Sequence, residues 1–428
     1  MTILLGTLLL IVLLLIGIPV AFALGVAGTA ALFFIAPVST IVGLMTTIVH
    51  DTMANYVILT IPAFVMMSEF LSVGGIADDM MIACNRLLRR LRGGLAMACV
   101  LAGAVLAASS GSSTASVATI SRAAFPTMLR LGYDRGLAVG TIAISGTLAI
   151  MIPPSIALVV YGILTEESIG KLFLAGIGPG LLTAAGYIVT ILFVLWRRPD
   201  FAPSFQDDLV DESGEAIEQK GRVWPIGLLV LLVLGSLYSG LATPTEVGAI
   251  GTVGAFLLSL LLGRMTFANF VQAIGNTLRT TTMIVAIIFG ALMFGYFMTY
   301  TQVTSQLLQF IADAEVGPYV VLICTLVVYL ILGMLMDQFA ILVLTVPISY
   351  SIITGLHFDP IWFGVLITKT AEIGLVTPPV GLNIFIASAA TNTPTKVGFR
   401  GVAPFVVMEI LLLAILVAFP QISLYLVG

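Results

Sequence analysis

The sequence predicts an all-α polytopic membrane protein, and three observations carry that prediction. Hydrophobic residues make up 60% of the 428 residues, charged residues only 9%, and the mean hydropathy is +1.17. Soluble domains carry about a quarter charged residues, so a water-soluble fold is excluded. Two Pro-Pro pairs, Pro153-Pro154 and Pro378-Pro379, interrupt apolar segments in the two halves of the chain. Alternating amphipathic strands are absent, which disfavours a membrane barrel.

Several apolar stretches approach the length of about 20 residues that crosses a bilayer as a helix. They include Trp224 to Leu241, Ile284 to Thr299 and Phe405 to Phe419. The opening run, Ile3 to Ile16, lacks a basic leader and a small-residue cleavage site, so we expect a retained helix rather than a signal peptide. The residues before Pro37 fit either one long kinked span or two short ones.

The two halves of the chain share landmarks at a constant spacing. The pairs separated by 225 residues are Pro19 and Pro244, Asp134 and Asp359, and Pro153 and Pro378. Because these landmarks recur in the same order, we predict an internal repeat. The predicted parts are a first repeat over 1–197, an acidic connector over 198–222 and a second repeat over 223–428. Pro126 and Pro347 miss the spacing by four residues, so we expect their hairpins to differ in length.

Charge placement predicts that the repeats are inverted. The densest basic cluster, Arg86 to Arg92, predicts a cytoplasmic loop, because basic loops stay cytoplasmic. Its counterpart, Ile311 to Gly317, carries two acidic residues and no basic one. Matching loops on opposite sides of the membrane are typical of inverted repeats. The connector, rich in Asp and Glu, is expected to be a flexible cytoplasmic segment.

Each repeat is expected to contain a re-entrant helical hairpin, over 94–130 in the first repeat and 318–355 in the second. The first hairpin turns at Ser109 to Thr114, a run too polar to face lipid. Two segments that mix charged and apolar residues at helical spacing are expected to be interfacial arms. These are Ile76 to Leu91 and Phe267 to Leu278.

The Pro-Pro pairs predict a binding site. Proline removes a backbone donor, so the carbonyls before each pair are freed, and such breaks persist at membrane depth only beside protein or a watery cavity. Paired breaks between two repeats are typical of transporters, and sodium prefers such oxygen ligands. Helix N-termini at the hairpin tips favour an anionic substrate. The expected substrate-binding residues are Ser109, Gly111, Ser113, Thr114, Ser155, Asp337, Gln338, Pro379 and Asn383.

Ionisable residues in apolar surroundings are functional hypotheses by default, and Asp337, Lys369 and Glu372 meet that description. Lys369 and Glu372 are three residues apart on a predicted helix, so we expect them to neutralise one another. Glu246, beside Pro244, is expected to support the scaffold.

Ordered motifs across nearly the whole chain resemble one family. They are Ser110-Gly111-Ser112-Ser113-Thr114-Ala115, Gly146-Thr147-Leu148, Ile152-Pro153-Pro154-Ser155, Thr243-Pro244-Thr245-Glu246, Leu332-Gly333-Met334 with Asp337, and Glu372-Ile373-Gly374 through Thr377-Pro378-Pro379-Val380-Gly381-Leu382-Asn383. The chain thereby resembles the large membrane subunit (DctM type) of tripartite ATP-independent periplasmic (TRAP) transporters.

The resemblance implies a sodium-driven importer of small organic anions in the bacterial inner membrane, with an elevator mechanism. It implies two partners, a small four-helix membrane subunit and a periplasmic substrate-binding protein. It also implies two sodium sites, on Ser110, Ser112, Ala149, Ile152 and Pro154, and on Gly333, Gly374, Thr377 and Val380. Sodium is then the coupling ion and no other cofactor is expected. One departure is Ala149, where the family usually has glycine.

Other classes of function remain open on the sequence alone. A passive anion channel would also need a polar path, although charged rings along a pore are missing. Another ion-coupled carrier of the same superfamily fits the same pattern. An intramembrane hydrolase would need a hairpin serine beside His50 or His357, the only histidines. No enzyme, no ATP-binding loop, no metal centre other than sodium and no nucleic-acid partner is expected.

Overall fold

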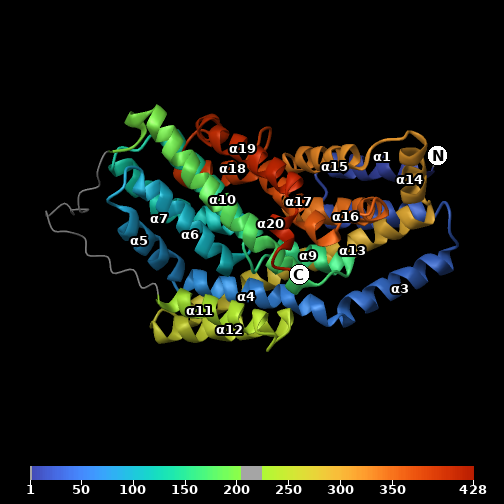
Figure 1. Ribbon diagram of the computed structural model, residues 1–428. Coiled ribbons are helices and arrows are strands. Elements are labelled where there is room, and N and C mark those ends of the chain that lie inside the picture. The colour runs from blue at the N-terminus through green and yellow to red at the C-terminus, as the bar shows by residue number, and fades with distance from the viewer. Residues whose placement is uncertain (1, 204–223) are drawn as a thin grey trace.

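The computed structural model describes residues 2–203 and 224–428, except for the side chains of residues 2, 77–78, 107–110 and 312 (Figure 1). Every regular element in these ranges is a helix. Seven helices in the described part of the chain are long and apolar enough to cross a membrane. The chain is therefore a multi-pass helical membrane protein. Most of the predicted connector lies outside the described residues.

The described part of the first half, residues 2–203, contains ten α-helices and two short 3₁₀ turns. They are α1 (Thr2–Leu15), α2 (Val20–Leu32), α3 (Val38–Ala54), η1 (Tyr56–Leu59), α4 (Thr60–Val73), α5 (Ile76–Leu88), α6 (Gly94–Ser110), α7 (Ser113–Arg130), α8 (Arg135–Met151), α9 (Ile156–Thr165), α10 (Ile169–Arg197) and η2 (Pro199–Phe201). The segment before Pro37 thus forms two short helices, because Gly17 turns the chain with a φ of +86° that favours glycine.

Residues 224–428, the described part of the second half, contain ten more helices. They are α11 (Trp224–Tyr238), α12 (Pro244–Leu261), α13 (Phe267–Tyr300), α14 (Val303–Asp313), α15 (Pro318–Gly333), α16 (Gln338–Gly355), α17 (Pro360–Gly374), α18 (Leu382–Thr391), α19 (Thr395–Ala418) and α20 (Gln421–Leu424). The segment Phe267 to Leu278, expected to be an interfacial arm, does not form a helix of its own. That segment is the first part of the continuous 34-residue α13, since no Pro or Gly-rich turn interrupts it.

The two hairpins have arms of nearly equal length. The second arms, α7 and α16, both have 18 residues, and the first arms, α6 and α15, have 17 and 16. The prediction that the hairpins differ in length is therefore wrong. Pro126 and Pro347 occupy different turns of equal helices, so their spacing reports where each kink lies rather than an insertion.

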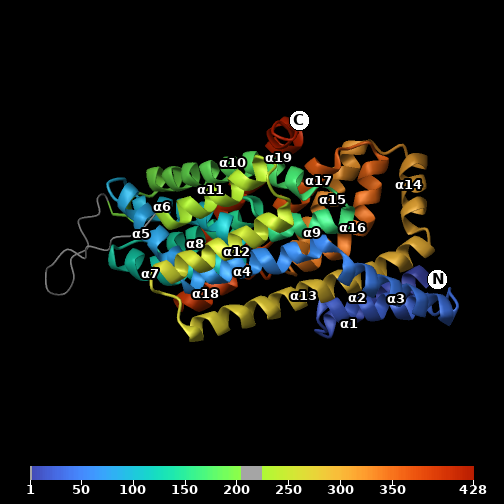
Figure 2. The same ribbon diagram turned by 90° about the horizontal axis from the view of Figure 1, so that it is seen from below.

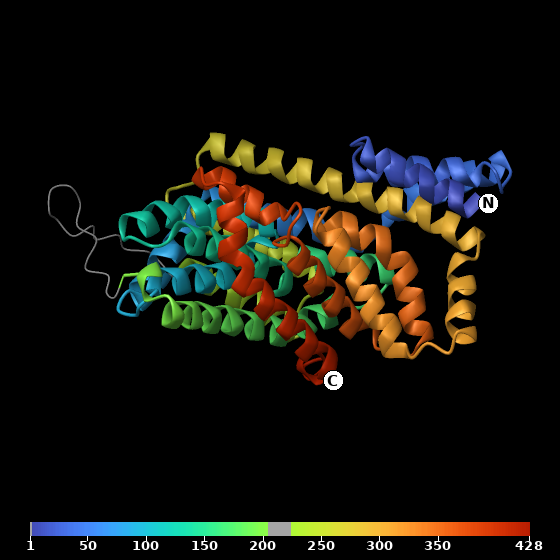
Figure 3. The ribbon, with the colours of Figure 1, turned by 90° about the horizontal axis from the view of Figure 1, so that it is seen from above.

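The helices divide into two packing groups. Helices α1, α2, α4, α11, α12 and α13 pack mainly on one another, with α2 and α4 against α13. The second group contains the hairpins and breaks: α6 and α7 pack on α8, α15 on α17, α16 on α9, and α10 on α19. Helix α4 touches α6 and α9 of the second group, and α13 touches α16. Figure 3 shows α13 and the first helices along one edge and the C-terminus on the opposite edge.

The hairpins lie in opposite halves of the molecule. Helices α6 and α7 lie in the left half of Figures 1 and 2, and α15 and α16 lie in the right half. The amphipathic helices that precede them, α5 and α14, lie toward opposite ends of Figure 2. The two broken helices, α8–α9 and α17–α18, lie between the hairpins and pack on both of them.

Candidate functional site

The first Pro-Pro break leaves one backbone carbonyl without its helical donor. The carbonyl of Ala149 would normally accept from residue 153, but Pro153 has no N–H. The amide of Ile152 cannot replace it, because it donates one turn back to Leu148 at 3.0 Å. Ala149 is fully buried. Its carbonyl is therefore an oxygen available to a ligand at the end of α8.

The next carbonyl is satisfied at both breaks, by different donors. At the first break the Ile150 carbonyl accepts from the hydroxyl of Ser155, the residue that also caps α9. At the second break the equivalent Leu375 carbonyl accepts from the amide of Asn383 at 3.0 Å. Both Pro-Pro bonds, 153–154 and 378–379, are cis. Each break is thus closed across its gap by a hydrogen bond.

The second break keeps more of its backbone bonded and more of its surface open. The amide of Thr377 donates to Gly374 O at 3.0 Å, and its hydroxyl donates to Ile373 O at 2.6 Å. The Gly374 carbonyl retains a second lone pair. Residues 378–380 are exposed, whereas residues 153–155 are buried.

The tip of the second hairpin lies directly against the second break. A Cβ on Gly374 would lie 2.4 Å from the Gly333 Cα, so only glycine fits at this crossing. The amide of Val380 donates to Met334 O at 3.2 Å, which joins the same two segments. Gly333, Gly374, Thr377 and Val380, predicted together, are therefore brought together.

The tip of the first hairpin contacts both breaks. Gly111 has a φ of +53°, and a Cβ there would lie 2.9 Å from the Ile156 side chain, at the start of α9. Ser113 donates from its hydroxyl to Asn383 Oδ1 at 3.0 Å, just past the second break. The side chains of Ser109 and Ser110, two predicted site residues, lie outside the described residues.

The second arm of each hairpin begins with a side-chain cap. The Ser112 hydroxyl accepts from the amide three residues on and lies 3.2 Å from Thr114 Oγ1. Asp337, 225 residues later, accepts from the amides of Phe339 and Ala340 at 2.9 and 3.2 Å. Both caps mark a helix N-terminus at a hairpin tip, where the helix dipole favours negative charge.

Two buried amide side chains at the tips have polar atoms without a protein partner among the described residues. They are Asn383 Nδ2 and Gln338 Oε1, on side chains that are 0% and 5% exposed. Buried polar atoms are almost always hydrogen-bonded. A donor and an acceptor are thus available to a bound molecule beside the hairpin tips.

Comparison with known proteins identifies the family. The family model of the tripartite ATP-independent periplasmic transporter, DctM component, matches residues 7–422. The chain belongs to this DctM family. The DctM protein of a C4-dicarboxylate TRAP transporter from Pseudomonas aeruginosa is 35% identical, over 94% of this chain and 93% of that protein.

Other relatives of this DctM-family protein are named for different substrates. The ectoine TRAP transporter large permease TeaC of Halomonas elongata is 30% identical over 97% of this chain and 96% of its own length. The isethionate permease DctMQ of Oleidesulfovibrio alaskensis is 29% identical over 97% of this chain and 65% of that protein.

Solved transporters share the fold at low identity. The YdaH transporter of Alcanivorax borkumensis superposes with a TM-score of 0.71 at 15% identity, covering 97% of this chain and 98% of YdaH. MtrF of Neisseria gonorrhoeae gives 0.60 at 13% identity, covering 88% and 84%. These likenesses support the architecture alone.

The DctM-family protein belongs to a class of permeases rather than enzymes. Its two histidines are both exposed, His50 on α3 and His357 in the turn after α16, and no described hydrogen bond joins either to a hairpin serine.

Burial raises the pKa of the Cys84 thiol on α5 to about 11, which keeps it un-ionised and unreactive at neutral pH.

Sequence reasoning missed part of a buried charge cluster in this DctM-family protein. Lys369 and Glu372 form the predicted pair at 3.3 Å, but Lys369 lies closer to Glu409 of α19, at 2.5 Å. The hydroxyl of Tyr187 on α10 donates to Glu409. All four side chains are 0% exposed. A charged residue inside the apolar span Phe405 to Phe419 was the available signal.

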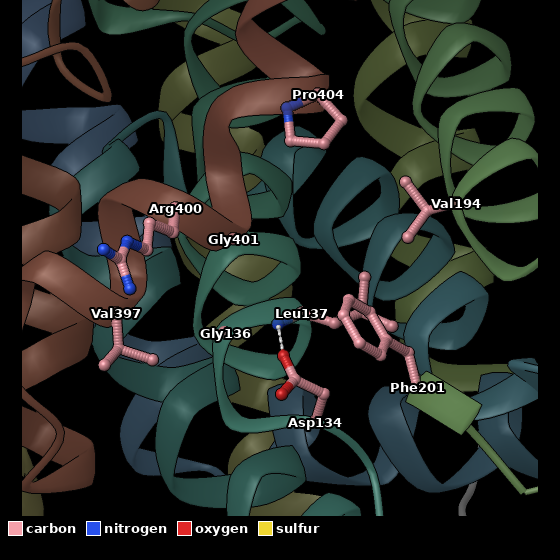
Figure 4. A pocket seen from close by; sticks show the side chains of 9 residues that line it. All are labelled: Asp134, Gly136, Leu137, Val194, Phe201, Val397, Arg400, Gly401 and Pro404. Atoms are coloured by element: carbon pink, nitrogen blue, oxygen red, sulfur yellow. Dashed lines mark hydrogen bonds between the residues drawn. The ribbon is translucent and has the colours of Figure 1, made fainter. Parts of the chain in front are cut away.

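Two hollows lie away from the tips. One of about 300 Å³ lies near the N-termini of α8 and α19, and Asp134 and Arg400 are among the residues that line it (Figure 4). One oxygen of the Asp134 carboxylate caps α8, because it accepts from the amide of Leu137 at 2.9 Å. The other, of about 470 Å³, is bounded by Asn55–Val57, by the turn between α9 and α10, and by residues 243–245.

Proposed function

We propose that this protein imports a small organic anion together with sodium across the bacterial inner membrane. The observation that carries the proposal is the meeting of two hairpin tips with two interrupted helices, where Ser113 bonds Asn383 and Gly333 touches Gly374. Helix ends, unpaired carbonyls and capped N-termini in one place suit both a cation and an anion.

The two predicted sodium cages differ in the support they have. For the first, on Ser110, Ser112, Ala149, Ile152 and Pro154, support comes from the Ala149 carbonyl, which Pro153 leaves without a helical donor. For the second, on Gly333, Gly374, Thr377 and Val380, support comes from the close crossing of the two glycines. Alanine presents the same carbonyl as the glycine usual in the family, so the first cage is retained in this proposal.

The substrate would lie between the tips. Asn383 Nδ2 and Gln338 Oε1 supply a donor and an acceptor, and the N-termini of α7 and α16 supply positive dipole ends. Three relatives have names that include C4-dicarboxylate, isethionate and ectoine. Each of these molecules carries a carboxylate or sulfonate group, so a small acid is the proposed class.

Movement would follow the division of the helices into two packing groups. The group with the hairpins and breaks would travel as an elevator against α1, α2, α4, α11, α12 and α13. The recurrence of α7 and α16 at the 225-residue spacing, and the placement of the hairpins in opposite halves of the molecule, support inverted repeats. The cavity of about 470 Å³ lies between residues of both groups.

Two partners complete the proposed system. A periplasmic substrate-binding protein would deliver the anion, and a small four-helix membrane subunit would brace the non-moving group. The name of the Oleidesulfovibrio alaskensis relative, DctMQ, and its greater length support a second subunit that can be fused to the large one.

The test is uptake into proteoliposomes that contain the chain with its small subunit and binding protein. The probes are radiolabelled succinate, isethionate and ectoine, each with an inward sodium gradient or with potassium in its place. We expect sodium-dependent uptake of one of them, weakened in Ser110→Ala, Ser112→Ala and Thr377→Ala. Uptake of all three probes that is indifferent to sodium, or sodium dependence unchanged in every variant, would overturn the proposal.

A further inference from the structure

Four helices contribute to one fully buried polar network. Helix α17 supplies Lys369 and Glu372, α19 supplies Glu409, α10 supplies Tyr187, and α8 supplies Thr147. Each of these five side chains is 0% exposed. Such a group of polar side chains is expensive inside a membrane protein, which makes it a candidate for a functional role.

The charges in this network are arranged around one ammonium. Lys369 Nζ lies 2.5 Å from Glu409 Oε2 and 3.3 Å from Glu372 Oε2, and it donates to Thr183 Oγ1 at 2.9 Å. Helix α17 is thereby attached to both α19 and α10 by charged bonds. Charge-assisted hydrogen bonds of this kind fix geometry more firmly than neutral ones.

Tyr187 is the junction of the network. Its hydroxyl donates to Glu409 Oε1, lies 3.4 Å from Glu372 Oε1 and lies 3.0 Å from Thr147 Oγ1. Because the single proton of Tyr187 goes to Glu409, the Thr147 hydroxyl is the donor in its bond to Tyr187, and the Ile144 carbonyl at 2.7 Å is its alternative acceptor. One phenol oxygen therefore joins the end of α8 to the end of α17.

Those two helix ends carry the proposed sodium ligands. Thr147 lies two residues before Ala149, and Glu372 lies two residues before Gly374. Both helices end at a Pro-Pro break, so each presents the negative end of its dipole to the same region. The two negative helix ends repel one another when no cation is bound. The contacts through Tyr187 limit how far one helix end can move without the other.

We infer that Tyr187 is a positioning residue that couples the two sodium sites, so that sodium at one break favours sodium at the other. The inference rests on the proposed function, because it needs both sites to bind sodium. The physical route is contiguous: Thr147 donates to Tyr187, and Tyr187 donates to Glu409 and lies 3.4 Å from Glu372, with no loop between them. Coupling of this kind is reciprocal.

The test is a sodium titration of the purified chain with its small subunit, followed by the thermal unfolding midpoint, with choline as the control cation. Bound sodium stabilises the folded state by mass action, so the midpoint reports occupancy. We expect a Hill coefficient above one for the wild type. Tyr187→Phe is expected to lower it to one and to raise the half-saturating sodium concentration by about fivefold or more.

Tyr161→Phe is the matched control. Tyr161 is equally buried, and its hydroxyl donates to Pro360 O at 2.6 Å, so it ties α9 to the opposite end of α17 without touching the network. Loss of a purely structural hydrogen bond would lower the unfolding midpoint in both variants and leave both sodium titrations like the wild type. That result would overturn the coupling while leaving the proposed function intact.

Glu409→Gln gives a second route in case Tyr187→Phe does not fold. The glutamine keeps the shape, but Tyr187 loses its charged acceptor and Lys369 loses its closest anion. We expect the same fall in the Hill coefficient. A wild-type protein that does not respond to sodium would overturn the proposed function and the coupling together, whereas non-cooperative sodium binding by the wild type would overturn the coupling alone.

Discussion

The hydroxyl of Ser113 donates to the side-chain carbonyl of Asn383 at 3.0 Å, across 270 positions of sequence. Ser113 begins the second arm of the first hairpin, and Asn383 lies in the first turn of α18, just past the second break. Both side chains are buried. The bond therefore joins the hairpin of one half of the chain to the interrupted helix of the other half.

The Ser113–Asn383 bond predicts non-additive mutations. Ser113→Ala leaves the Asn383 carbonyl buried without its donor, and we expect a loss of about 1–3 kcal/mol in the free energy of unfolding. Asn383→Leu removes the acceptor and the unpaired Nδ2 together. Because both changes break one bond, the double variant is expected to lose less than the sum, by about 0.5–3 kcal/mol.

Thermal and denaturant unfolding of the four proteins in detergent measure this cycle. Uptake is expected to fall in Asn383→Leu further than in Ser113→Ala, since only the former removes the free amide donor. Strict additivity of the two stability losses would show that the contact does not hold the tip.

The Gly333–Gly374 crossing predicts that a single methyl group disables the second hairpin. A Cβ on Gly374 would lie 2.4 Å from Gly333 Cα and 2.5 Å from its carbonyl carbon, both backbone atoms that cannot rotate away. Overpacking of this kind costs about 1–3 kcal/mol or more, and here it displaces a carbonyl of the proposed sodium cage. We expect Gly374→Ala to abolish sodium-dependent uptake.

Gly275→Ala is the control for that substitution. Gly275 lies in α13, and nothing lies within 4 Å of the position that a Cβ would take there, so an alanine improves helix propensity and leaves uptake unchanged. Ala149→Gly, which introduces the glycine usual in the family at the first break, is expected to retain uptake. Full activity of Gly374→Ala would contradict the assignment of this crossing.

The sequence predicted the hairpins and breaks because their signals are local. Proline lacks an N–H wherever it stands, so Pro153 and Pro378 end α8 and α17 close to where the sequence places them. The signal for the turn before α7 is also local, because the polar residues that predict it lie in the turn itself. Asp134 and Asp359, landmarks of the predicted repeat, also recur as N-caps of α8 and α17.

Contacts between helices far apart in the chain could not be predicted from the sequence. Lys369 and Glu372 could be paired because they share one helix face, but Glu409 and Tyr187 join them only through the packing of α10 and α19 on α17. The extent of the helix that begins at Phe267 was also not predicted. Amphipathic spacing there is real, yet nothing in the sequence ends the helix before the apolar stretch of α13 begins.

Substitutions of Asp337 can separate the effect of its negative charge from its role as a helix cap. Its carboxylate accepts from two amides at the start of α16, so its first role is a helix cap. Asp337→Asn keeps an N-cap and loses the charge, and we expect near wild-type stability and uptake. Asp337→Ala loses the cap and about 1 kcal/mol of unfolding free energy.

Thermal unfolding and uptake separate the two variants at Asp337. If the charge itself acts on substrate or sodium, Asp337→Asn will lose uptake while its unfolding midpoint stays the same. That result would show that Asp337 does more than cap α16. The equivalent cap on α7 is Ser112, which is uncharged, so the two hairpins need not behave alike.

Arg264 is expected to hold helix α5 in place. Its guanidinium forms two bonds with Asp79 of α5, at 2.9 and 3.2 Å, and also donates to the carbonyls of Gly74 and Gly75 at the turn before that helix. The Asp79 side chain is 8% exposed and that of Arg264 is 36% exposed, so solvent screens the pair only in part. Arg264→Met is expected to cost about 1–3 kcal/mol and to raise amide hydrogen exchange in α5. Arg264→Lys keeps the charge but not the two-pronged geometry, so it should recover only part of that protection. Arg279→Met, on the exposed face of α13, is the control and should leave α5 protected. Unchanged exchange in Arg264→Met would mean that packing against α6 holds α5 in place without the ion pair.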